Sequence, residues 1–165
     1  MTVDTAAADL AVTAIGLLRE RDYTVATAES LTGGLVAAAL TTVPGSSSVF
    51  RGGIVAYAAD LKTALLGVPG ELLARVGTVH SEVAVAMARG ARERLGSAVG
   101  LGTTGVAGPD PADGQPVGTV HLAVSFGDRV LHRLLALAGD RAQIRRETVD
   151  RVLALLIEAL LEDNE

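Results

Sequence analysis

A serine hydroxyl stands at the start of a glycine-containing turn in residues 26–34, whose sequence is ATAESLTGG. A short apolar stretch precedes Ser30, and strong helix formers follow from Leu35 to Leu40. Ser30 is therefore predicted to lie where a strand ends and a helix begins, among the free backbone N–H groups of that helix. A hydroxyl in this position can act as a nucleophile or as an anion ligand. The turn by itself leaves both roles open.

Lys62 is the residue that could activate Ser30 in place of a histidine. It is the only lysine in the chain, and all the other permanently basic side chains are arginines. A lysine acts as a base only when neutral, so its surroundings must lower its pKa through burial or nearby positive charge. Because arginine keeps its proton, the single lysine favours a role that needs a deprotonatable cation. An exposed helix lysine without such a role is the alternative.

A second glycine-rich segment runs from Gly102 to Asp110 and is predicted to be a loop directly after a strand. Its glycines let the backbone approach a ligand closely, and the hydroxyls of Thr103 and Thr104 can donate to phosphate or sugar oxygens. The segment lacks the ending of a P-loop, and the chain lacks the Rossmann fingerprint, so no nucleoside triphosphate or dinucleotide site is indicated. A plain glycine-rich turn is the alternative.

Three arginines lie in the first two turns of the last predicted helix, where the helix dipole disfavours positive charge. Arg146 can pair with Asp150 four residues later. Arg141 and Arg145 have no such neighbour, and a bound phosphate would explain them. Solvated surface arginines are the alternative.

Metal and cofactor chemistry finds little support in the sequence. The histidines (His80, His121 and His132) lack metal-binding spacing and are interpreted as structural. Asp110 and Asp113 share a proline-rich loop, which is only a weak metal signal. Because the chain has no cysteine, thiol nucleophiles, disulfides and thiolate zinc sites are excluded. We expect no metal and no cofactor.

Composition indicates one soluble domain. The chain has 165 residues, of which 49% are hydrophobic, and no uninterrupted apolar run reaches the length of a membrane helix. Its net charge of -5 argues against non-specific nucleic-acid binding. The first residues lack the pattern of a signal peptide. We therefore expect a cytoplasmic protein with neither a nucleic acid nor a membrane as partner.

Alternating helical and strand patterns place these residues and predict an α/β fold. A Gly127-Asp128 hairpin turn near the end makes the sheet mixed. We expect a three-layer α/β/α sandwich around a mixed, mostly parallel sheet of about five strands. Helices are predicted over residues 5–21, from the Ser30 turn to before Pro44, over 58–66 and 70–75, from a cap at Ser81 to Gly96, and after a capping box at Asp140 and Gln143; strands are predicted over 23–28, 49–57, 98–103, 117–126 and 130–137.

Ordered motifs across nearly the whole chain carry a family resemblance. They are TAESLTGG, PGSSSVFRGG, a tyrosine five residues before a lysine, GTTGVAGPDP and PVGTVHLAV. In this order they resemble the CinA C-terminal domain family, the nicotinamide-nucleotide amidases. The resemblance implies a single domain of this type over residues 1–165, in a stand-alone form, whereas many relatives carry a further N-terminal domain. It also implies a self-associating chain, as a dimer or higher homo-oligomer.

The activity that the resemblance implies is hydrolysis of nicotinamide mononucleotide to nicotinate mononucleotide and ammonia, which serves pyridine-nucleotide recycling. The family's serine nucleophile matches Ser30 and its lysine matches Lys62. Neutral Lys62 would take the Ser30 proton, and an acyl-enzyme would form without a metal. The other expected site residues are Thr32, Gly33 and Gly34 as oxyanion donors; Tyr57, Thr104 and Gly105 lining the substrate site; Thr103, Arg141 and Arg145 at the phosphate; and Glu29 orienting Lys62, balancing the pyridinium charge, or held in a structural ion pair.

The sequence departs from the family pattern in two places. Ala59 and Asp60 stand where relatives often have asparagine and glutamate, and His80 stands where serine is common. The missing amide removes a hydrogen-bonding group near Lys62. Two rival functions remain, a nucleotide-binding module with little turnover and an interaction protein connected with DNA uptake or damage response. The presence of both Ser30 and Lys62 favours the enzyme.

Overall fold

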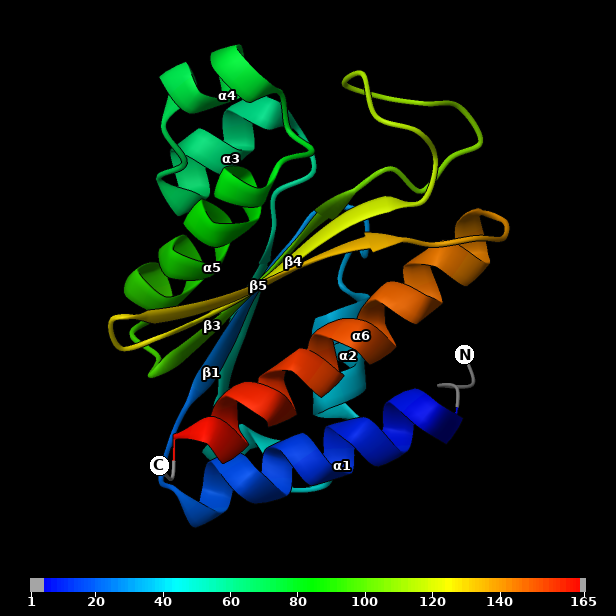
Figure 1. The fold of residues 1–165 in the computed structure, drawn as a ribbon. Coiled ribbons are helices and arrows are strands. Elements are labelled where there is room, and N and C mark those ends of the chain that lie inside the picture. Colours follow the sequence, from blue (N-terminus) through cyan, green and yellow to red (C-terminus); the bar gives the residue numbers. More distant parts are fainter. Residues whose placement is uncertain (1–4, 164–165) are drawn as a thin grey trace.

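The computed structural model describes residues 5–163, which form a five-stranded sheet between two layers of helices (Figure 1). The predicted α/β/α sandwich is confirmed. The helices are α1 (Thr5–Glu20), α2 (Leu35–Thr41), α3 (Ala59–Leu66), α4 (Gly70–Val76), α5 (Ser81–Leu95), α6 (Arg141–Glu162) and the short 3₁₀ helix η1 (Ser46–Ser48). The strands are β1 (Val25–Glu29), β2 (Phe50–Val55), β3 (Val99–Gly105), β4 (Thr119–Phe126) and β5 (Arg129–Ala136).

The strand order across the sheet is β2-β1-β3-β4-β5. β1 pairs in parallel with both β2 and β3, whereas β4 runs antiparallel to β3 and to β5. Four strands therefore point one way, and only β4 opposes them. The register of the β4–β5 pair joins Phe126 to Arg129, which confirms the predicted hairpin turn. β1 and β2 consequently end at the same edge of the sheet, as parallel strands do.

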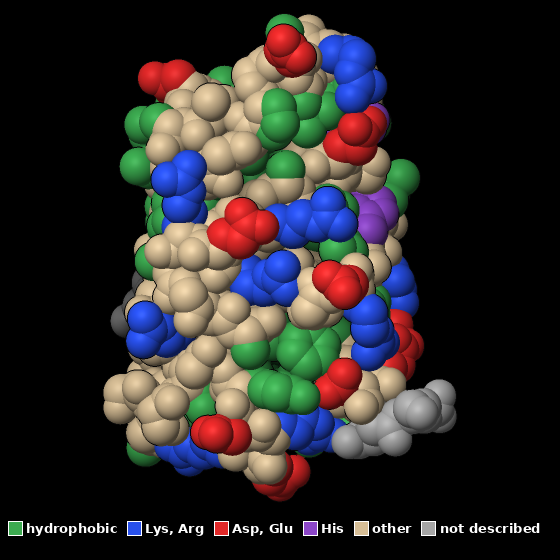
Figure 2. Space-filling model, turned by 90° about the vertical axis from the view of Figure 1, so that its left-hand side faces the viewer, with side chains coloured by type: hydrophobic (Ala, Val, Ile, Leu, Met, Phe, Trp, Pro, Cys, Tyr) green, Lys and Arg blue, Asp and Glu red, His purple; other side chains and the backbone are tan. Residues whose placement is uncertain are grey.

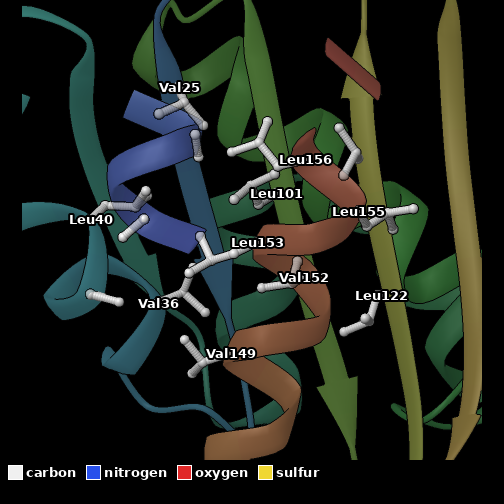
Figure 3. Close-up of a cluster of buried hydrophobic side chains, with 14 of the residues drawn as sticks. Val25, Val36, Leu40, Leu101, Leu122, Val149, Val152, Leu153, Leu155 and Leu156 are labelled. Atoms are coloured by element: carbon white, nitrogen blue, oxygen red, sulfur yellow. The ribbon is translucent and has the colours of Figure 1, made fainter. Parts of the chain in front are cut away.

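The main hydrophobic core lies between the sheet and the layer formed by α1, α2 and α6. Apolar side chains of α6 meet those of β1, β3, β4 and α2 there (Figure 3). Each fully buried aliphatic side chain contributes about 1.5–3 kcal/mol to folding. The residues at the centre of this core are Val25, Val36, Leu40, Leu101, Leu122, Val149, Val152, Leu153, Leu155 and Leu156.

The opposite face of the sheet is covered by α3, α4 and α5 (Figure 1). Two glycines of β3 let α5 lie close to the sheet, because a Cβ on Gly100 or Gly102 would collide with the backbone of α5. The sequence interpretation placed Gly102 in a loop, and this is wrong, since β3 continues to Gly105. Glycine serves here for close packing of a helix on a strand. The loop begins only after Gly105.

Helix ends follow local side-chain chemistry. Asp140 accepts a hydrogen bond from the Gln143 N–H (2.9 Å), and the Gln143 side chain accepts one from the Asp140 N–H (2.8 Å), so the predicted capping box is confirmed. The cap of α5 is not Ser81 but His80, whose Nδ1 accepts from the N–H of Glu82 at 3.2 Å.

Within residues 5–163, no helix is both long and apolar enough to cross a membrane.

Candidate active site

Ser30 is the first residue after β1, and it is fixed by backbone bonds on both sides. Its N–H donates to the Thr103 carbonyl at 3.0 Å, and its own carbonyl accepts from the Gly33 N–H at 3.0 Å. Gly33 and Gly34 have φ values of 56° and 102°, a region that favours glycine, and α2 starts at the next residue. The predicted placement of Ser30 between a strand and a helix is confirmed. Of the three expected oxyanion donors, Gly33 is engaged in this turn.

Lys62 reaches Ser30 from the second turn of α3. Its Nζ lies 2.9 Å from Ser30 Oγ, 2.7 Å from the Ala56 carbonyl oxygen and 3.1 Å from the Tyr57 carbonyl oxygen. The lysine is fully buried, so the interpretation as an exposed helix lysine is wrong. Burial lowers its pKa to about 8, an effect that the negative charge of Asp113 opposes.

The three contacts of Lys62 determine which way its lone pair points. A neutral amine has two N–H groups and one lone pair, and the carbonyls of Ala56 and Tyr57 can only accept. When both N–H groups donate to these carbonyls, the lone pair remains for the Ser30 hydroxyl, which is 2.9 Å away. A protonated lysine would instead donate its third N–H to Ser30 Oγ. The geometry therefore suits a proton transfer between the two side chains.

A cavity of about 210 Å³ opens beside Ser30. Its wall comes from the Ser30 turn, Tyr57, residues 78–79, the segment from Gly105 to Asp113, and Arg141. This volume is below that of most sites for drug-sized ligands and suits one ring with a small substituent. A larger groove of about 750 Å³ is lined mainly by α3, α4 and α5, and its lining includes neither Ser30 nor Lys62.

Arg141 closes one side of the mouth of the Ser30 cavity. Its guanidinium donates to the Gly108 carbonyl at 2.6 Å and to the Tyr57 hydroxyl at 2.8 Å. Tyr57 keeps 56% of its surface exposed. The first residue of α6, the loop after β3 and the segment after β2 therefore meet at this mouth, where Arg141 adds a positive charge.

Arg145 does not join Arg141 at the mouth of the cavity. Its Nε donates to the Leu31 carbonyl at 2.9 Å, and its terminal nitrogen donates to the Thr32 carbonyl at 3.2 Å. It does not line the Ser30 cavity. The structure does not bring Arg145 to a phosphate site, because its planar fork holds the backbone of the Ser30 turn.

The predicted threonines fasten neighbouring elements together. The hydroxyls of Thr32 and Thr103 lie 2.8 Å apart in the interior, and the Thr104 hydroxyl donates to the Thr78 carbonyl at 2.7 Å. None of the three lines the cavity, whereas the predicted Gly105 does. The expectation of a Thr103 contact to phosphate does not fit this arrangement, because that hydroxyl is buried and already bonded.

The carboxylate of Glu29 forms its hydrogen bonds with α2 and not with Lys62. Its two carboxylate oxygens accept from the N–H groups of Val36 and Ala37 at 2.8 and 3.1 Å. These N–H groups belong to the first turn of α2, where backbone donors lack helical partners and the dipole favours an anion. The expectation that Glu29 orients Lys62 is therefore replaced by a capping role. Sequence spacing gave no signal for it, since the bonds span seven and eight residues.

Comparison with known proteins identifies the family. The model of the CinA C-terminal domain matches residues 7–160. The chain belongs to this family. A CinA-like protein of Frankia casuarinae is 51% identical over 142 residues, which cover 86% of this chain and 33% of that protein. A putative competence-damage inducible protein of Desulforamulus reducens is 45% identical over 84% of this chain and 34% of its own length. The chain thus spans about a third of these relatives.

Solved structures of the CinA superfamily agree with the fold. The competence/damage inducible protein CihA of Agrobacterium tumefaciens superposes with a TM-score of 0.92 at 39% identity, covering 97% of this chain and 98% of that one. A CinA superfamily protein of Escherichia coli gives a TM-score of 0.91 at 30% identity, with 96% and 94% covered. The names of these two proteins refer to competence and damage.

This CinA domain also has an acidic side chain, Asp113, at the cavity. The sequence indicated this residue only as a weak candidate for a metal ligand. Asp113 Oδ2 accepts from the N–H of Thr78 at 2.6 Å and from its hydroxyl at 2.5 Å. These bonds lower the pKa of Asp113. The signal available in the sequence was the Asp113-Gly114 pair, which is typical of a turn. In the structure Asp113 has a φ of 49°, a region where aspartate is tolerated better than most side chains.

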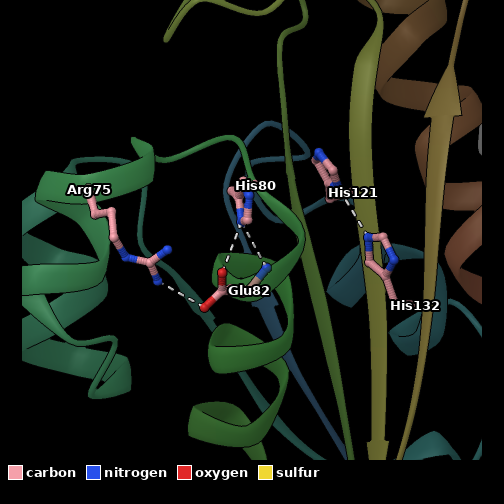
Figure 4. Close-up of polar contacts among 5 residues, drawn as sticks. All are labelled: Arg75, His80, Glu82, His121 and His132. Carbon is pink, nitrogen blue, oxygen red and sulfur yellow. Dashed lines mark hydrogen bonds and ion pairs between the residues drawn. The ribbon is translucent and has the colours of Figure 1, made fainter.

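The three histidines form a short row beside α5 (Figure 4). His121 Nδ1 lies 3.0 Å from His132 Nε2, while His80 caps α5. Burial lowers the pKa of His121 to about 4, and both neighbouring histidines add to the effect. Within residues 5–163, no three His, Cys, Asp or Glu side chains form a group that could hold a metal ion. The stacked rings connect the start of α5 with β4 and β5.

Proposed function

We propose that this CinA domain hydrolyses the carboxamide of nicotinamide mononucleotide through an acyl-enzyme on Ser30. The observation that carries the proposal is the 2.9 Å contact between Ser30 Oγ and the buried Lys62 Nζ. A serine requires a base within hydrogen-bond reach, and a desolvated lysine can be that base. Membership of the CinA family supports the choice of substrate.

In the first half-reaction, neutral Lys62 takes the proton of Ser30 while Oγ bonds to the amide carbon. The carbonyl oxygen gains the negative charge in the tetrahedral intermediate, and backbone N–H groups of the Ser30 turn, with Thr32 and Gly34 as candidates, stabilise it. Protonated Lys62 then gives its proton to the departing nitrogen as the C–N bond breaks. Ammonia leaves, and nicotinate mononucleotide stays esterified to Ser30 through its carboxyl group.

The second half-reaction uses the same lysine. Neutral Lys62 takes a proton from a water molecule, whose oxygen bonds to the ester carbon, and then returns the proton to Ser30 Oγ as the ester bond breaks. Nicotinate mononucleotide and free serine result. The carbonyls of Ala56 and Tyr57 hold the lysine in one orientation throughout both steps.

The size of the cavity supports a division of the substrate between the cavity and its mouth. About 210 Å³ accommodates the pyridinium ring and its carboxamide, so the ribose and phosphate extend through the mouth. Arg141 and the half-exposed Tyr57 stand at this mouth. Arg141 is therefore proposed as the phosphate contact. Glycine-rich backbone from Gly105 to Gly108 forms the wall beside the ring.

Ammonia release from purified protein and nicotinamide mononucleotide tests the proposal. We expect steady release by wild type, a fall of at least about 10³-fold for Ser30→Ala, and no change for Ser47→Ala, whose serine is exposed and does not line the cavity. Mass spectrometry after rapid quenching should find the acyl group of nicotinate mononucleotide bound to Ser30. No ammonia from wild type would refute the amidase, and undiminished release by Ser30→Ala would refute the nucleophile.

A second candidate is a binding or interaction protein, because relatives carry names that refer to competence and damage induction. The face in Figure 2 bears acidic and basic side chains side by side, without a continuous basic stripe, and the net charge is -5. Direct binding of nucleic acid is therefore less favoured than binding of a small nucleotide. Tight binding of nicotinamide mononucleotide without ammonia release would favour this second candidate.

A further inference from the structure

A carboxylate lies in the same small cavity as the Ser30 hydroxyl. Asp113 and Ser30 both line the space of about 210 Å³, and Asp113 comes from the loop between β3 and β4. Thr78 fixes the carboxylate through its N–H and its hydroxyl, at 2.6 and 2.5 Å. Any ring that places a carboxamide at Ser30 must therefore occupy a space that this charge borders.

The charge of Asp113 acts inside the site. The two bonds from Thr78 favour the ionised form, and the carboxylate raises the pKa of Lys62 against the effect of burial. The field of Asp113 therefore reaches the base beside Ser30.

Other charges near the cavity are engaged elsewhere or stand at its edge. Both oxygens of Glu29 accept from α2, and Arg145 holds the Ser30 turn. Arg141 is bonded to Gly108 and Tyr57 at the mouth. Asp110 adds a second carboxylate to the wall of the cavity. The described lining of the cavity thus holds two carboxylates, Asp110 and Asp113, and one guanidinium, Arg141.

We propose that Asp113 is a specificity-determining residue that makes the Ser30 cavity prefer amides on a cationic ring over neutral amides of the same shape. This inference rests on the proposed function, which supplies a pyridinium substrate. A pyridinium ring substituted at its ring nitrogen carries a permanent positive charge, and a fixed carboxylate at the wall attracts it. The ring charge in turn offsets the action of Asp113 on Lys62, so the base loses its proton more readily when substrate is bound.

The test compares two ligands that differ in ring charge, nicotinamide and 1-methylnicotinamide, by calorimetric titration of the full chain. Wild type is expected to bind the cation about three- to tenfold more tightly. Asp113→Asn should bring the ratio close to one, because asparagine can still accept from Thr78 and tolerates positive φ, so only the charge is lost. Asp128→Asn, in the distant β4–β5 turn, changes net charge equally and should keep the wild-type ratio.

A second measurement does not depend on any variant. Raising salt should reduce the wild-type preference for the cation, because the Asp113 side chain is exposed and its charge is screened. Equal or undetectable binding of the two ligands by wild type, or an unchanged ratio in Asp113→Asn, would overturn the inference. The inference stands and the amidase falls if the charge preference depends on Asp113 while nicotinamide mononucleotide yields no ammonia. Ammonia release together with an unchanged ratio in Asp113→Asn would support the amidase and overturn the inference about Asp113.

Discussion

Lys62 Nζ meets Ser30 Oγ at 2.9 Å although 32 positions separate the two residues in the chain. Ser30 follows β1, and the carbonyls of Ala56 and Tyr57 that orient the lysine follow β2. Because β1 and β2 are parallel neighbours, both segments emerge at the same edge of the sheet. α3 then brings Lys62 back over this edge. The topology therefore assembles the pair.

Removing the lysine tests its role as the base. In Lys62→Met the side chain keeps its approximate volume but cannot take a proton, so ammonia release from nicotinamide mononucleotide should fall by at least about 10³-fold. Thr63→Ala, at the exposed neighbouring position of α3, should retain wild-type rates. Circular dichroism checks that both variants fold. Activity of Lys62→Met within tenfold of wild type would require another base.

The pH dependence of the rate follows from the pKa of Lys62. Burial lowers that pKa to about 8, and only the neutral amine can act as a base. The value of kcat/KM should therefore rise about tenfold per pH unit below this value and level off above it. Ammonia release between pH 6 and 10 measures the profile. A rate that is flat or falls as pH rises through 8 would contradict a lysine base.

Arg141 should distinguish substrates with and without a phosphate. Its guanidinium stands at the cavity mouth beside Tyr57, so Arg141→Met should raise KM for nicotinamide mononucleotide about 10- to 100-fold. The KM for nicotinamide riboside, which has no phosphate, should change less than threefold. Steady-state kinetics with both substrates provides the measurement. Equal effects on the two would assign Arg141 a structural role at the mouth.

Arg145 should affect the rate and not the affinity. Its two bonds hold the carbonyls of Leu31 and Thr32, so Arg145→Met should loosen the Ser30 turn and lower kcat about tenfold or more. The KM for nicotinamide mononucleotide should remain within about threefold. Loss of these bonds should also reduce the free energy of unfolding by about 1–3 kcal/mol in urea titration. A large rise in KM with unchanged kcat would favour a phosphate contact instead.

Glu29 should matter for stability. A glutamine keeps one acceptor oxygen where the carboxylate offers two, so Glu29→Gln leaves one N–H of the first turn of α2 without its partner. We expect a loss of about 1–3 kcal/mol in the free energy of unfolding, measured in urea. Glu20→Gln, at an exposed position at the end of α1, should stay within about 0.5 kcal/mol of wild type. Equal stability of both variants would contradict the capping role.

Much of the fold was accessible from local patterns. Hydrophobic periodicity, the Asp140–Gln143 capping box and the Gly127-Asp128 hairpin depend on residues close in the chain, and the structure has all of them. The segment after Gly102 was misjudged because glycine is typical of loops. In β3 it instead permits contact with α5, which only the packed structure reveals.

The sequence by itself determined that a serine hydroxyl stands between β1 and α2, because side-chain periodicity, glycines at positive φ and helix propensity are local properties. Tertiary structure decided which side chains reach it. Strand order brings together the segments on which four features of the site depend. These are the burial of Lys62, the hydrogen bonds from Arg145 to the Ser30 turn, the capping of α2 by Glu29 and the position of the Asp113 carboxylate at the cavity. Such contacts span 7 to 114 positions and leave no periodic trace in the chain.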